Sequence, residues 1–173
     1  GSQITETGIR PCASPVGRLM AYASTKAKAI STILTSEMQA LGEDIRAVII
    51  TDFEKTSATT LVEGVMDDEA GGAVAAFRQA VSCDNVDLLN PILMTGSTVL
   101  VDDDLAVEFL AAANDWIKQR DLAITLVDEI RGDYHEIVGK GKDWIPRYYS
   151  FMITEFFQQG ITKCLIGTRG LLG

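Results

Sequence analysis

The sequence has little of what several common protein classes require. Its 173 residues include one histidine, His135, and three widely separated cysteines, Cys12, Cys83 and Cys164. One histidine cannot complete a metal site that is built on several histidines. An odd number of distant cysteines encodes neither a disulfide framework nor a zinc cluster. The lack of a disulfide framework favours a reducing, cytoplasmic setting.

Long apolar runs and positive charge are also lacking. No run approaches the roughly 20 residues that a membrane helix needs, and no signal-peptide pattern is present, so no membrane partner is expected. The formal net charge of −9 argues against a freestanding nucleic-acid-binding protein, because phosphate neutralisation needs clustered Lys and Arg. A domain that offers a few contacts beside a more basic partner lobe stays possible. The Gly-x-x-x-x-Gly-Lys-Ser/Thr phosphate loop is absent.

What is present indicates one folded domain. Hydrophobic residues make up 47% of the chain, which excludes overall disorder, and the length suits a single core. We expect residues 1–14 to be a tag scar, Gly1-Ser2, followed by a linker or arm. Residues 15–173 are then expected to form a single α/β domain.

Helical and strand-like patterns alternate along the chain. Helices are predicted from about Ser24 to Gly42, over 72–81, after the Asp102-Asp103-Asp104 run, and from Pro146 to Gly160. Strands are predicted at 45–50, 122–127, 134–138 and 161–166, and the first is expected to be covered on both faces. Residues 91–101 form either a hairpin or a kinked strand around Thr95-Gly96-Ser97. This alternation predicts a three-layer, mostly parallel sheet with helices on both faces.

The most informative stretch closes the chain. The apolar run that ends at Ile166 opens into a predicted Gly167-Thr168-Arg169-Gly170 turn. A buried strand delivers such polar groups to the carboxyl edge of a sheet, where α/β domains bind ligands. The chain ends three residues later, so we expect a C-terminally truncated piece of a larger machine.

These closing residues resemble the C-terminal RecA-like lobe of superfamily 2 (DEAD/DEAH-like) helicases and translocases. The resemblance rests on Pro146-Arg147, on Phe156-Phe157-Gln158-Gln159-Gly160, and on Cys164 to Gly173, which is similar to motif V. Further back, Ser24-Thr25-Lys26 and Ile45 to Asp52 look like the first helix and the motif IV strand of that lobe. The resemblance covers about 24–55 and 134–173. The middle, about 56–121, departs from a minimal lobe and is expected to be an insertion or elaboration.

The resemblance implies roles for three residues. Thr168 takes the place of the motif V threonine that contacts the nucleic-acid backbone, with Arg169 adding a phosphate contact and Thr51 a weaker second one. The intact parent is expected to use ATP and Mg²⁺, with an N-terminal RecA-like lobe as partner and DNA or RNA as substrate. This fragment lacks the phosphate loop and the later arginine finger, so it is expected to hold no cofactor and to hydrolyse no ATP.

Other interpretations stay open. The chain is alternatively a non-enzymatic α/β protein-interaction domain or, more weakly, a metal-dependent phosphohydrolase using Asp52. The acidic runs 67–69 and 102–104 are interpreted as helix starts, because consecutive residues on one helix or strand cannot all face one ion. An exposed sheet edge is expected to allow self-association.

Core roles are predicted for three further residues. Cys164 is expected to be an inert core thiol and His135 to pack or hydrogen-bond near a strand. Trp144 either anchors the last helix or stacks on a base.

Overall fold

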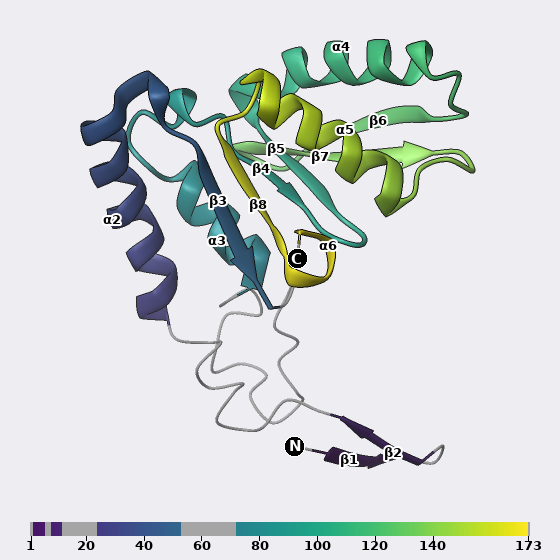
Figure 1. Ribbon diagram of the computed structural model, residues 1–173, viewed down its shortest axis with the longest axis horizontal. Helices are drawn as coiled ribbons and strands as arrows, with labels where there is room; N and C mark the ends of the chain where they lie inside the picture. The colour runs from purple at the N-terminus through teal and green to yellow at the C-terminus, as the bar shows by residue number, and fades with distance from the viewer. Residues whose placement is uncertain (1, 6–7, 12–23, 53–71, 173) are drawn as a thin grey trace.

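The computed structural model describes residues 2–5, 8–11, 24–52 and 72–172 (Figure 1). The expected arm therefore falls partly outside the described residues, as does the first part of the expected elaboration. Within the arm, β1 (Ser2–Thr5) and β2 (Gly8–Pro11) pair as a two-stranded antiparallel sheet.

The main body is a six-stranded sheet with the strand order β3-β8-β4-β5-β7-β6. Its strands are β3 (Ala47–Thr51), β4 (Ile92–Met94), β5 (Val99–Asp102), β6 (Thr125–Ile130), β7 (Tyr134–Lys140) and β8 (Cys164–Thr168). Its helices are α2 (Ser24–Leu41), α3 (Gly72–Val81), α4 (Asp103–Gln119), α5 (Pro146–Gln159) and the short α6 (Arg169–Leu172). Two 3-10 turns lie at Gly42–Asp44 and Val86–Leu88.

The sheet is mixed, which corrects the prediction of a mostly parallel one. β8 pairs in parallel with β3 and β4, whereas the β4–β5, β5–β7 and β6–β7 pairs are antiparallel. The β4–β5 and β6–β7 pairs are antiparallel because a tight turn joins the two strands of each pair. The helix α4 connects β5 to β6, and β7 lies between these two strands in the sheet. Residues 91–101 thus form the hairpin alternative, and a second hairpin joins β6 to β7.

The three layers are confirmed. Helices α2 and α3 cover one face of the sheet, and α4 and α5 cover the other (Figure 1). The strand β8, between β3 and β4, contributes to both cores, since Cys164 and Ile166 face the first and Leu165 faces the second. Apolar side chains that alternate along a buried strand are what a two-sided sheet requires.

The predicted ends of the last helix are confirmed. Pro146 occupies the first turn of α5, where its missing N–H costs nothing, and Gly160 closes the helix with a φ of 84°. Tyr149, Met152 and Phe156 form the buried face of α5. The chain leaves this helix at Gly160 and enters β8 at Cys164.

The exposure of β3, the bounds of β6 and the end of β8 differ from prediction. β6 spans Thr125–Ile130 rather than 122–127. β3 lies at the edge of the sheet, where Val48 and Ile50 are 52% and 53% exposed, so it is not covered on both faces. The predicted turn after Gly167 is also absent, because β8 continues through Thr168 and α6 begins directly at Arg169.

Candidate nucleic-acid interface

Thr51 and Thr168 lie side by side at the carboxyl edge of the parallel strands. Each is the last residue of its strand, and the two are register partners in the β3–β8 pair. Neighbouring strands are about 4.8 Å apart, so both threonines lie at one end of the sheet. Both are half-buried. The structure thus brings together two of the three residues that sequence reasoning selected.

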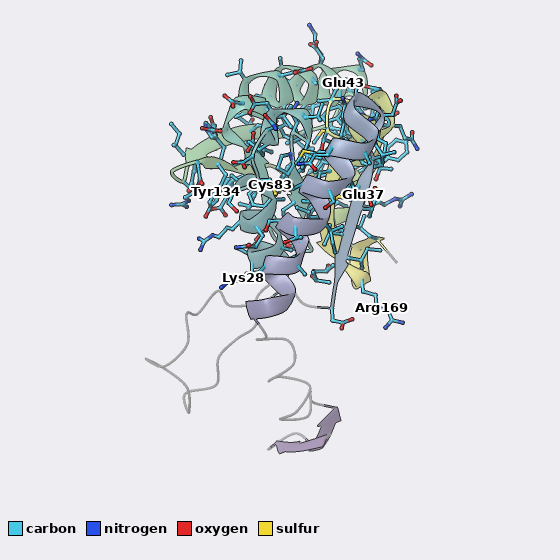
Figure 2. All side chains as sticks on the ribbon, turned by 90° about the vertical axis from the view of Figure 1, so that its left-hand side faces the viewer. Lys28, Glu37, Glu43, Cys83, Tyr134 and Arg169 are labelled. Atoms are coloured by element: carbon cyan, nitrogen blue, oxygen red, sulfur yellow. The ribbon has the colours of Figure 1, made fainter. Side chains whose placement is uncertain are left out.

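Arg169 follows at the same edge. It is exposed at the start of α6 and points away from the body of the protein (Figure 2). Among the described residues no hydrogen bond or ion pair engages its guanidinium. Its position suits a charge-assisted contact with a bound anion.

The close turn from β8 into α6 depends on Gly167. A Cβ at this position would lie 2.5 Å from Leu172 Cδ1 and 2.9 Å from the carbonyl oxygen of Met94. Only the absence of a side chain lets α6 fold back this closely against the strand end. Gly167 therefore determines where Thr168 and Arg169 are presented.

The β4–β5 hairpin adds hydroxyl groups to this edge, although sequence reasoning, which predicted a hairpin or a kinked strand here, gave it no part in the site. Thr95 Oγ1 accepts hydrogen bonds from the backbone N–H groups of Ser97 and Thr98, and Tyr149 donates one from its hydroxyl to the Thr95 carbonyl at 2.6 Å. Met94 is the register partner of Gly167, which brings the hairpin beside Thr168. The residue types were visible in the sequence, but this neighbourhood depends on strand order, which sequence does not reveal.

Three residues outside this edge take the core roles expected of them. Burial raises the pKa of Cys164 to about 12, and a thiol that stays protonated is chemically inert. His135 Nδ1 lies 2.7 Å from Asp128 Oδ1 across the β6–β7 pair. The Trp144 ring packs against Tyr149 of α5 with a centroid separation of 5.0 Å, which confirms the anchoring role.

The acidic run at the start of α4 overturns the geometric argument against a shared ion. One carboxylate oxygen from each of Asp102, Asp103 and Asp104 lies within 4.8 Å of the others. Asp102 precedes the helix but makes no side-chain capping hydrogen bond, contrary to its expected role. Burial, followed by the charges of Asp103 and Asp104, raises the pKa of Asp102 to about 7. The other acidic run, 67–69, falls outside the described residues.

No helix in the described ranges is long and apolar enough to cross a membrane.

Known proteins give no further guide to this edge. Comparison with protein-family models, with curated proteins and with solved structures finds no match to this chain. The case for function therefore rests on the residues and their arrangement.

Proposed function

We propose that this chain is the C-terminal RecA-like lobe of an ATP-dependent helicase or translocase and contributes contacts to a nucleic-acid backbone. The observation that carries the proposal is the pairing of Thr168 with Thr51 at the carboxyl ends of adjacent parallel strands. Ligands of open α/β sheets bind at this edge. Arg169 supplies a positive charge there, and Ser97 and Thr98 lie in the neighbouring hairpin turn.

The proposed role is cooperative rather than independent. A hydroxyl and a backbone N–H bind phosphate without reading sequence, so this edge suits positioning contacts. One exposed guanidinium gives only a small electrostatic contribution in a chain of net charge −9. An N-terminal lobe is proposed to supply the phosphate loop, the Mg²⁺ site and most of the affinity, with the ATP cleft between the lobes. The isolated chain is proposed to lack ATPase activity.

The first test is binding of fluorescent single- and double-stranded DNA and RNA to the 173-residue chain, followed by anisotropy at several salt concentrations. Thr168→Ala removes one hydrogen bond, worth about 0.5–1.5 kcal/mol, so affinity should fall about 2- to 10-fold. Arg169→Ala should weaken binding to all sequences and lower the salt slope by about 1. Lys118→Ala, at an exposed position on α4, is the charge-matched control.

If Arg169→Ala and Lys118→Ala weaken binding equally, the affinity reflects overall positive charge rather than a defined site. That result would contradict the proposal. A second measurement uses the longer parent that carries a phosphate loop. There Thr168→Ala should abolish the stimulation of ATP turnover by nucleic acid while leaving basal turnover in place.

A non-enzymatic protein-interaction domain is the second candidate, and one observation favours it. Exposed apolar side chains of α2 and of the edge strand β3 line a shallow groove: Ile33, Leu41, Val48 and Ile50. A contiguous apolar patch of this kind often marks a protein interface. Absence of nucleic-acid binding by both the chain and its parent would favour this candidate.

A further inference from the structure

A second cluster of chemically active groups lies at the opposite end of the sheet from Thr168. β5 is antiparallel to β4, and the backbone N–H of Asp102, its last residue, donates to the carbonyl of Pro91 at 3.2 Å. Asp102 therefore lies beside the residue that precedes β4, whereas Thr168 lies at the carboxyl edge of the parallel strands. The two sites are separate, so a role for the cluster around Asp102 does not rest on the proposed function.

A change of backbone conformation brings three consecutive side chains together. Asp102 has extended dihedral angles, φ −53° and ψ 145°, and α4 begins at the next residue. At this junction the strand's alternation of side chains stops and the helical rotation starts. The carboxylates of Asp102, Asp103 and Asp104 converge as a result, with one oxygen of each within 4.8 Å of the others.

Asp102 shows that the cluster is incomplete as it stands. Its side chain is fully buried, and neither carboxylate oxygen has a hydrogen-bond partner among the described residues. A buried ionised carboxylate without a partner is strongly unfavourable, and proteins normally compensate it with a cation or with hydrogen bonds. This unpartnered side chain is directed toward the exposed carboxylates of Asp103 and Asp104, which connect it to solvent.

The surroundings increase the negative charge rather than compensate it. The charges that act on Asp102 are those of Asp103, Asp104, Asp87 and Asp133, all of them carboxylates. Asp87 belongs to the 3-10 turn Val86–Leu88 before β4, and its carboxyl group lies close to that of Asp104. Asp133 lies in the turn between β6 and β7. Three separate connections of the chain thus bring acidic groups to one point.

We propose that Asp102, Asp103 and Asp104, with Asp87 beside them, form a binding site for a hard divalent cation of the Ca²⁺ class. Carboxylate oxygens are the ligands that such cations prefer. Two oxygens bound to one Ca²⁺ at about 2.3–2.6 Å are at most about 5 Å apart, and the spacing here meets that limit. Mg²⁺, at about 2.0–2.1 Å, requires the ligands to move closer. The bound ion compensates the negative charge of the buried Asp102 carboxylate.

The test is a titration of the 173-residue chain with CaCl₂, and separately with MgCl₂, after treatment with a chelator. Calorimetry should show saturable binding at one site, and Ca²⁺ should raise the thermal midpoint by several degrees more than NaCl of equal ionic strength. Asp104→Asn should weaken Ca²⁺ binding at least tenfold. Asp115→Asn, an exposed change on the same helix but outside the cluster, should leave it unchanged.

Asp102→Asn separates a cation from the competing explanation, a protonated Asp102. The substitution removes the buried charge, so it should raise the midpoint of the ion-free protein and eliminate its response to Ca²⁺. A wild-type protein that shows no saturable Ca²⁺ binding would overturn the proposal in favour of protonation. Equal loss of binding in Asp104→Asn and Asp115→Asn would overturn it in favour of diffuse attraction to an acidic surface. Circular dichroism of each variant checks that the fold is retained.

Discussion

At the scale of single residues, burial has opposite consequences for two ionisable groups. Cys164 and Asp102 are both fully buried, and burial disfavours the charged form of each. A neutral thiol packs like a small apolar side chain, so Cys164 fits its core without a partner. A carboxyl group retains strong polar demands even when neutral. Asp102 therefore marks a site, whereas Cys164 marks only the core.

The thiol of Cys164 is predicted to resist alkylation in the folded protein. Burial raises its pKa to about 12, so the thiol stays protonated at the pH of labelling, and the surrounding core blocks access as well. Iodoacetamide labelling mapped by mass spectrometry, in a Cys12→Ser background, should leave Cys164 unmodified until denaturant is added. Cys83, which is 7% exposed whereas Cys164 is fully buried, is the internal reference. Labelling of Cys164 at the rate of Cys83 would contradict this account of the core.

At the scale of elements, the junction between β8 and α6 controls how the candidate interface is presented. Gly167→Ala places a methyl group against Leu172 and the Met94 carbonyl. Overpacking of this kind costs about 1–3 kcal/mol, and part of the strain should be relieved by displacement of α6. Urea denaturation should show the loss of stability, and nucleic-acid affinity should fall with it.

Gly170→Ala is the matched control for that junction. A Cβ at Gly170 meets nothing within 4 Å, and alanine favours a helix by about 1 kcal/mol relative to glycine. This variant should be as stable as the wild type or slightly more so, with unchanged affinity. Equal destabilisation by both substitutions would show that α6 tolerates no change at all and that the close contact of Gly167 is not the cause.

The sequence predicted individual elements well, because their signals are local. Pro146 and Gly160 define the ends of α5, and α4 begins within the acidic run 102–104 where a helix start was predicted. The position of β3 at the edge of the sheet was not predictable, since a β-branched run such as Ala47–Thr51 is equally compatible with an edge and with a centre. The convergence of the three aspartates was not predicted, because consecutive residues were expected to lie on one helix or one strand. In the structure Asp102 ends a strand and Asp103 begins a helix.

At the scale of the whole molecule, the six-stranded sheet has two edge strands, β3 and β6, and β3 is the more apolar in sequence. Among the described strands β3 pairs only with β8. The N–H of Ala47 donates toward β8, to the Lys163 carbonyl, so the backbone groups of Val48 and Ile50 point outward from the sheet. Unpaired backbone with apolar side chains is a template for another strand. The structure therefore provides the exposed edge on which the expectation of self-association depended.

The edge sequence is also complementary to itself. In an antiparallel pair centred on Ile49, Val48 lies opposite Ile50 of the second copy, and Arg46 lies opposite Asp52. This register places outward-facing backbone groups against each other and gives an opposite-charge pair at each end. Such cross-strand pairs each contribute about 0.2–1 kcal/mol.

We therefore predict that the chain self-associates through β3 as its concentration rises, as measured by sedimentation velocity. Ile50→Lys should shift the equilibrium toward monomer because it places a charge in the apolar centre of the pair. Val107→Lys, at an 81% exposed position on α4, is the control and should have no effect. Arg46→Asp should weaken association, and the double variant Arg46→Asp/Asp52→Arg should restore it. A wild-type chain that stays monomeric at all concentrations would instead show that α2, whose Ile33 and Leu41 line the same groove, shields the edge from a second copy.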